Sequence, residues 1–117
     1  MISITKIVEF EAAHHLPGHK GRCHNLHGHS YKLEVEVGGI INADGMIMDF
    51  GILKIVMENL VDDYFDHKNL NDTFINPTAE YMVEWIAFQL RKHIDESNLL
   101  RVRLWETSSS YAEWKNQ

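Results

Sequence analysis

The chain has 117 residues, of which 44% are hydrophobic and 24% charged, and its formal net charge at pH 7 is −6. This length fits one domain over residues 1–117, and the negative charge, without any basic stripe, argues against a nucleic-acid partner. Because no apolar run reaches the length of a membrane span, no signal peptide is recognisable and Cys23 is the only cysteine, we expect a cytoplasmic protein with no membrane partner and no intrachain disulfide.

Two strand patterns open the chain. Residues 2–12 alternate between apolar and polar side chains, and the apolar face continues to His14. Residues 31–37 alternate in the same way, and their apolar face, extended backwards, includes His27 and His29. Sequential strands often pair antiparallel, which would bring the three histidines together at one end of the pair, on its inward face.

This convergence of His14, His27 and His29 predicts a metal site. A single histidine on an apolar face is more often a hydrogen-bonded core residue than a ligand. Three imidazoles in register, however, are the ligand set of a catalytic zinc ion whose fourth position stays open. Gly28 removes a side chain where two of the rings must turn toward one ion. The expected cofactor is therefore Zn²⁺.

The connection between the two strands, residues 15–26, is long for a hairpin, and long loops in small domains tend to be functional. It carries Cys23, with Lys20 and Arg22 close by in sequence. Three roles are open for the Cys23 sulfur: a fourth zinc ligand in a closed structural site, a thiolate that reacts beside the metal, or an inert buried side chain.

The rest of the chain predicts two helices and further strands. The expected elements are a short strand at 46–48, a helix capped by Asp49 that ends near Tyr64, an irregular segment at 66–72, a helix opened by 76–78 with Pro77 in its first turn, and strands at 100–105 and 111–114. The order is ββααββ, which indicates an α+β fold with two helices on one face of an antiparallel sheet.

Two further positions carry candidate chemistry. Asp66 and His67 are adjacent in the polar segment, where a carboxylate can orient an imidazole for acid–base work, although both residue types are also common in solvated loops. Glu106 ends an apolar strand. It is either a charge on the rim of the sheet or a bidentate acceptor for the two parallel N–H donors of a pterin or guanine edge.

The motifs of this chain, in their order, resemble the 6-pyruvoyl-tetrahydropterin synthase superfamily over essentially the whole sequence. They are Phe10-Glu11-Ala12-Ala13-His14, Cys23-x-x-x-His27-Gly28-His29, Asp66-His67-x-x-Leu70-Asn71, Pro77-Thr78-x-Glu80 and Glu106-Thr107. The three-residue gap between Cys23 and His27 resembles the 6-carboxy-tetrahydropterin synthase branch, which serves queuosine biosynthesis, whereas the gap in pyruvoyl synthases is typically longer. Ala79 departs from the second threonine that pyruvoyl synthases often show. The branch that makes hydroxymethyl-dihydropterin tends to use a glutamate near His-Gly-His, and none lies between Cys23 and His27.

The resemblance implies a tunnelling fold, in which a four-stranded antiparallel sheet with two helices on one side trimerises into a barrel and two trimers stack as a homohexamer. It implies that His14, His27 and His29 bind zinc and that Cys23 is the catalytic base. It also implies that Asp66 and His67 relay protons and that Glu106 anchors the pterin, assisted by Thr78. Active sites of the family lie between subunits, so the relay is expected to serve a neighbour's zinc.

The implied substrate is 7,8-dihydroneopterin triphosphate, which the carboxy branch converts to 6-carboxy-5,6,7,8-tetrahydropterin, acetaldehyde and triphosphate. An acidic protein that binds a triphosphate needs a local positive patch, for which we expect Lys20, Arg22 and Lys68. Two alternatives stay open. One is a 6-pyruvoyl-tetrahydropterin synthase, which only eliminates triphosphate; the other is a non-catalytic zinc protein that binds pterins.

Overall fold

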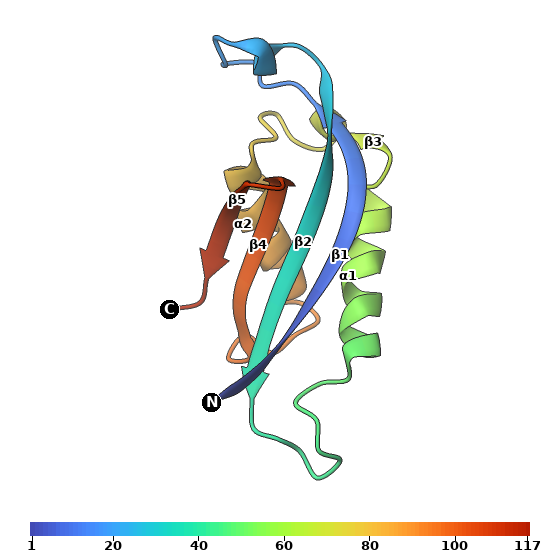
Figure 1. The fold of residues 1–117 in the computed structure, drawn as a ribbon, viewed down its shortest axis with the longest axis vertical. Helices are drawn as coiled ribbons and strands as arrows, with labels where there is room; N and C mark the ends of the chain where they lie inside the picture. Colours follow the sequence, from blue (N-terminus) through green and yellow to red (C-terminus); the bar gives the residue numbers. More distant parts are fainter.

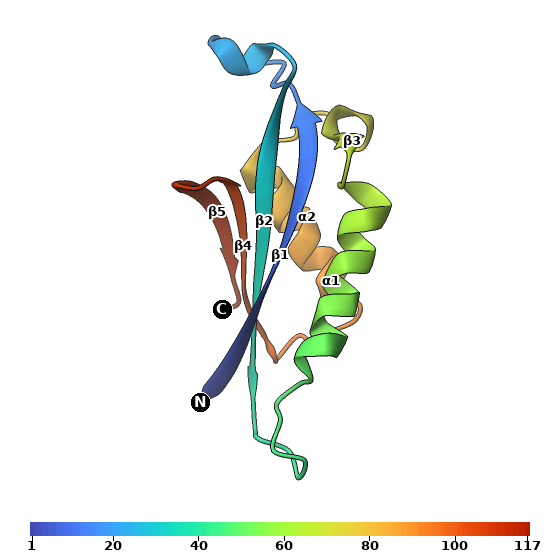
Figure 2. The same cartoon turned by 45° about the vertical axis from the view of Figure 1, so that its right-hand side comes forward.

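One sheet with two helices on a single face makes up the fold, as expected for the α+β class (Figure 1 and Figure 2). The computed structural model describes residues 1–117. Its elements are β1 (Ile2–His14), β2 (His27–Gly39), α1 (Phe50–Tyr64), β3 (Lys68–Asn69), α2 (Ala79–Leu90), β4 (Leu99–Thr107) and β5 (Ser110–Lys115), with 3₁₀ turns at Arg22–His24 and Leu70–Asp72. Neither helix combines the length and the apolar character that crossing a membrane requires.

The sheet has five strands in the order β3-β1-β2-β4-β5, one more than expected. The long strands β1, β2, β4 and β5 pair antiparallel, but β3 runs parallel to β1 and pairs only with Ala12 and Ala13. The chain passes the edge of β1 after α1, and its backbone there hydrogen-bonds with the open N–H and C=O groups of that edge. The sheet is therefore mixed, and its parallel part is two residues long.

Three local expectations were wrong. Residues 66–72 are not irregular throughout, because they contain β3 at Lys68–Asn69 and the 3₁₀ turn at Leu70–Asp72. Residues 46–48 do not continue the sheet: the Asn42 side chain donates to the carbonyl oxygens of Met46 and Ile47, which closes a turn instead. Pro77 lies before α2 rather than in its first turn, because Thr78 is the N-cap and its Oγ1 accepts the Tyr81 N–H at 3.2 Å.

The expected start of α1 is confirmed, since the Asp49 carboxylate caps the helix by accepting the Gly51 N–H. Its last helical residue is Tyr64, again as expected.

The core fills the space between the sheet and the two helices. Near the histidine end of β1 and β2, the ring of Phe10 stacks on Tyr31 with centroids 4.9 Å apart and on Phe65 with centroids 5.5 Å apart. Both Tyr31 and Phe65 are fully buried. These rings form a close-packed apolar layer beside the histidines. Close packing of this layer restricts movement of the strand ends that carry the histidines.

Candidate metal centre and active site

The three histidines predicted to converge do meet. Antiparallel pairing sets His14 opposite His27 and Ala12 opposite His29, which places the three imidazoles together on the face that carries the helices. Their candidate ligand nitrogens all lie within 4.8 Å of one another, and the Nε2 atoms of His14 and His27 are 3.1 Å apart. These residues could hold a metal ion.

The hydrogen bonds of the imidazoles leave their Nε2 atoms available to a metal. His14 Nδ1 donates to the Pro77 carbonyl at 2.8 Å, and His27 Nδ1 donates to the Asn25 carbonyl at 2.7 Å. A neutral imidazole that donates through Nδ1 carries a lone pair on Nε2. The His29 Nε2 atom is buried and has no hydrogen-bond partner. Converging lone pairs and an orphaned buried nitrogen are unfavourable by themselves, and a bound cation would satisfy them.

Burial also keeps two of these rings uncharged. It lowers the pKa of His14 and of His29, because the imidazolium form loses hydration inside the protein. The carboxylate of Glu106 acts in the opposite direction, with its oxygens 4.0 Å from His14 Nε2 and 3.7 Å from His29 Nε2. Since burial is the larger influence, both imidazoles are neutral near pH 7, the form that binds metal ions.

These lowered pKa values predict a pH-dependent stability for the metal-free protein. In the unfolded chain His14 and His29 bind protons near the ordinary pKa of 6.5, whereas in the folded chain they do so only at lower pH. The free energy of unfolding should therefore fall as the pH drops below 6.5, by at most about 1.4 kcal/mol per histidine and pH unit. Urea unfolding of the wild type and of His29→Gln at pH 7.5 and 5.5 measures this loss, which should be smaller in the variant; equal losses would contradict the assignment.

A cavity of about 500 Å³ lies beside Glu106, whose carboxylate faces His14 and His29. It is lined by Cys23, Thr78 and Glu106, among others, so three predicted site residues from three separate segments share one space. Cys23 is half-buried and does not belong to the group of possible metal ligands, which contains the three histidines alone. This arrangement speaks against a fourth ligand in a closed site and leaves the other two roles of the sulfur open.

Asp66 and His67 form a pair at the outer edge of β1. An Asp66 carboxylate oxygen lies 3.0 Å from His67 Nδ1, and the other accepts the Glu11 N–H at 3.0 Å. The Glu11 N–H, and secondarily His67, hold the pKa of the Asp66 carboxyl below its usual range. The ionised carboxylate thus orients the imidazole through Nδ1, which leaves Nε2 as the ring atom that can exchange a proton with a substrate.

The backbone of His67 adopts an unusual conformation. Its φ of 57° lies in the left-handed region, which costs a non-glycine residue about 1–2 kcal/mol. The His67 N–H donates to the Glu11 carbonyl at 2.6 Å, which helps to hold this conformation. Strained backbone of this kind is concentrated at functional sites. Nothing in the sequence pattern signals it.

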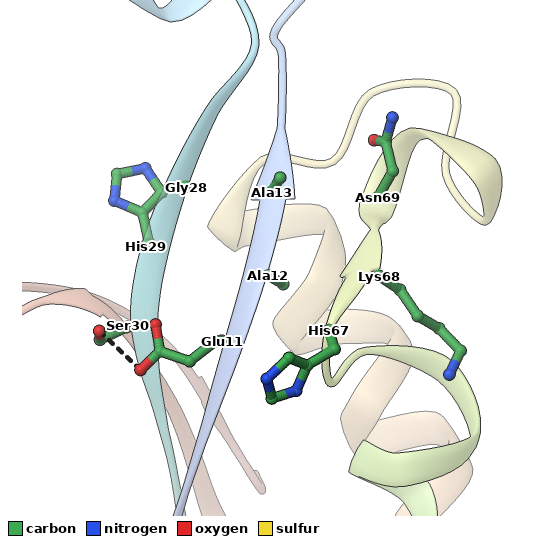
Figure 3. A pocket seen from close by; sticks show the side chains of 9 residues that line it. All are labelled: Glu11, Ala12, Ala13, Gly28, His29, Ser30, His67, Lys68 and Asn69. Carbon is green, nitrogen blue, oxygen red and sulfur yellow. Dashed lines mark hydrogen bonds between the residues drawn. The ribbon is translucent and has the colours of Figure 1, made fainter.

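A second cavity, of about 480 Å³, contains His67 rather than Cys23 (Figure 3). Glu11, Ser30 and Lys68 line it, and the Ser30 hydroxyl donates to the Glu11 carboxylate at 2.8 Å. His29 lines this cavity too, although the rings of His29 and His67 lie on opposite sides of β1 in this view, whereas Cys23 and Glu106 do not line it. One chain therefore does not bring the Asp66–His67 pair into the cavity of Cys23 and Glu106.

The predicted phosphate-binding cations are also divided. Lys20 and Arg22 are exposed on the connection between β1 and β2 and line neither cavity, whereas Lys68 lines the second cavity and its Nζ donates to the Asp62 carbonyl. The sequence did not lead us to expect Glu11 and Ser30 among the residues that line a cavity near the site. Their positions on the polar face of two adjacent strands, directly opposite each other, were the available signal.

Residues 3–117 match the family model described as 6-pyruvoyl tetrahydropterin synthase. The chain belongs to this family. It is 35% identical to a 6-carboxy-5,6,7,8-tetrahydropterin synthase of Haemophilus influenzae, an alignment that covers 98% of this chain and 99% of the relative. It is 41% identical to a dihydroneopterin monophosphate aldolase of Pyrococcus furiosus, over 83% of this chain and 82% of the relative.

The fold agrees with that of a solved member of the 6-pyruvoyl tetrahydropterin synthase family. The structure of the Caenorhabditis elegans 6-pyruvoyl tetrahydropterin synthase superposes with a TM-score of 0.86 and 27% sequence identity, covering 99% of this chain and 96% of the other. The family resemblance inferred from the motifs is thereby confirmed, and so is the tunnelling fold at the level of the single chain. The protein is an enzyme of the pterin synthase family, and three of its histidines could hold a metal ion.

Proposed function

We propose that this protein is a zinc-dependent 6-carboxy-5,6,7,8-tetrahydropterin synthase that acts on 7,8-dihydroneopterin triphosphate in cytoplasmic 7-deazaguanine (queuosine) biosynthesis. One observation carries the proposal: three imidazoles that could bind a metal lie together, and the Glu106 carboxylate lies within 4.0 Å of two of them. Glu106 and Cys23 line the same cavity. The three-residue gap between Cys23 and His27, and the relative from Haemophilus influenzae, support the carboxy branch over the pyruvoyl branch.

The side chains around the first cavity suit the steps of this reaction. A zinc ion bound by His14, His27 and His29 would supply Lewis-acid polarisation of the hydroxyl groups on the substrate side chain. The Glu106 carboxylate accepts two parallel hydrogen bonds from N–H groups of the pterin edge and so fixes the ring. Thr78 lines the same cavity. Cys23 acts as the general base that takes a proton from the substrate side chain. His67, oriented by Asp66, returns a proton elsewhere on that chain.

The separation of the two cavities supports an active site shared between subunits. Asp66 and His67 lie at the outer edge of β1, where only two residues of the strand are covered by β3. We expect a homohexamer built from two trimers, in which this pair reaches the cavity of Cys23 and Glu106 on a neighbouring subunit. The relay and the base would then act on one substrate although one chain keeps them apart.

The triphosphate is expected to bind near the exposed cations of the connection between β1 and β2. The double variant Lys20→Ala/Arg22→Ala should raise KM for the triphosphate substrate about 5- to 30-fold, since each exposed ionic contact contributes about 0.5–1 kcal/mol. The effect on kcat should be small. Steady-state kinetics tests this, with Lys54→Ala as the control, because Lys54 pairs with Glu58 on α1, away from the site. An unchanged KM in the double variant would show that other groups bind the phosphates.

Product analysis tests the proposed function as a whole. Zinc-loaded protein is incubated with 7,8-dihydroneopterin triphosphate, metal-free protein serves as the control, and products are identified by mass spectrometry. Acetaldehyde with 6-carboxytetrahydropterin is the expected result. A 6-pyruvoyl product without acetaldehyde would assign the pyruvoyl activity instead, and tight pterin binding without turnover would indicate a binding protein. Because one relative is a dihydroneopterin monophosphate aldolase, the monophosphate is assayed in parallel.

A further inference from the structure

The side chain of Asn71 joins the segment of the Asp66–His67 pair to the end of β1 that carries the metal cluster. Its Oδ1 accepts the His15 N–H at 2.8 Å, and its Nδ2 donates to the His15 carbonyl at 3.0 Å. One carboxamide thus satisfies both backbone groups of the residue that follows His14. Asn71 is half-buried, so solvent competes only partly for these bonds.

This contact continues the edge of the sheet beyond β3. The short strand pairs with Ala12 and Ala13 and then ends, because the chain enters the 3₁₀ turn at Leu70–Asp72. Within this turn the backbone N–H of Asn71 is already taken by the Asn69 side chain at 3.1 Å. The Asn71 carboxamide, with one donor and one acceptor side by side, supplies to His15 the pair of hydrogen bonds that a strand residue would give.

His14 is therefore held from two directions by one stretch of chain. The Pro77 carbonyl fixes its ring through Nδ1, and Asn71 fixes the backbone immediately after it. Upstream in the same stretch, Asp66 and His67 are bonded to the backbone of Glu11. Five hydrogen bonds thus tie residues 66–77 to the C-terminal end of β1 and to His15, beside both the predicted relay and the metal cluster.

We propose that Asn71 is a positioning residue for the metal cluster. Its carboxamide fixes the backbone of His15 and so sets where His14 presents Nε2 to the metal. It also couples the cluster to the segment that carries Asp66 and His67. This inference rests on the proposed metal site, and its test separates the two.

The test compares zinc affinity, measured by chelator competition, in the wild type, Asn71→Ala, Asn71→Asp and Asn116→Ala. Loss of a contact that orients a ligand typically weakens metal binding about 10- to 100-fold, and we expect a loss in this range for Asn71→Ala. Asn71→Asp keeps the size of the side chain but offers no donor to the His15 carbonyl, so it should weaken zinc binding too. Asn116 is a matched control: like Asn71 it makes two side-chain hydrogen bonds to the backbone, in its case by donating to the carbonyls of Glu96 and Leu99 at the far end of the sheet. Its loss should lower Tm without changing zinc affinity.

A double variant shows whether Asn71 acts through His14. In a His14→Ala background, Asn71→Ala should cause no further loss of zinc affinity, because the ligand that it positions is gone. An equal further loss in that background, or wild-type affinity in both Asn71 variants, would overturn the positioning role while the metal site stands. If the wild type itself binds no zinc, the proposed metal site fails, and the positioning role fails with it.

Discussion

His29→Ala is expected to weaken zinc binding about 100- to 1000-fold, since structural zinc sites bind the ion with about 10–16 kcal/mol through four ligands, or about 3–4 kcal/mol for each ligand. His29 is the most informative of the three histidines to remove. Its Nε2 has no hydrogen-bond partner in the protein, so its loss breaks no internal bond of that atom. By contrast, His14 and His27 each also donate to a backbone carbonyl, and their removal would disturb local structure as well.

This prediction is tested by the zinc content of the wild type and of His29→Ala after dialysis, measured by elemental mass spectrometry. The Tm of both metal-free proteins is measured alongside. The metal-free variant should unfold close to the wild-type Tm. His15→Ala is the control. It removes the histidine that follows His14 in the chain and is not in the ligand group, so this variant should keep its zinc. Full occupancy in His29→Ala would mean that the metal binds elsewhere.

Cys23→Ala is expected to lower kcat by about 10²- to 10⁴-fold while zinc and pterin binding persist, because a positioned acid or base typically contributes a factor of this size. Cys23 lines the cavity that Glu106 and Thr78 also line, and the three histidines form the ligand group without it. The sulfur can therefore be lost without removing a ligand from that group.

Three measurements on Cys23→Ala separate the roles of this residue: kcat, zinc content and pterin affinity by fluorescence. Loss of zinc together with activity would identify a closed structural site, and an unchanged kcat would identify an inert side chain. Cys23→Ser adds a comparison at nearly equal volume. Because a hydroxyl is a far weaker base than a thiolate at pH 7, it should resemble the alanine variant in kcat.

Much of the fold follows from local patterns in the sequence. The alternation through residues 2–12 and 31–37 fixes which face of each strand is buried, and antiparallel pairing then brings His14, His27 and His29 together without further information. The strand β3 was missed because two residues carry no periodicity. Its pairing depends on where the chain passes after α1, which is a property of the tertiary structure.

The candidate site was predictable in its residue types and less so in its geometry. Cys23 and Glu106 share a cavity, but His67 lines another, and no spacing in the sequence distinguishes these arrangements. The left-handed backbone at His67 and the bonds of Asn71 to His15 join positions that are far apart along the chain. Contacts of a side chain with a distant backbone leave no pattern for a sequence to show.

A site made of imidazoles alone also has a consequence for metal selectivity. Nitrogen donors of intermediate softness accept most divalent ions of the first transition series, and their affinities rise from manganese to copper before they fall at zinc. The ligand group here offers three such nitrogens and no thiolate or carboxylate of its own that would discriminate further. Copper and nickel should therefore compete for it whenever they are supplied, and the ion found in purified protein will reflect the growth medium as much as the preference of the chain.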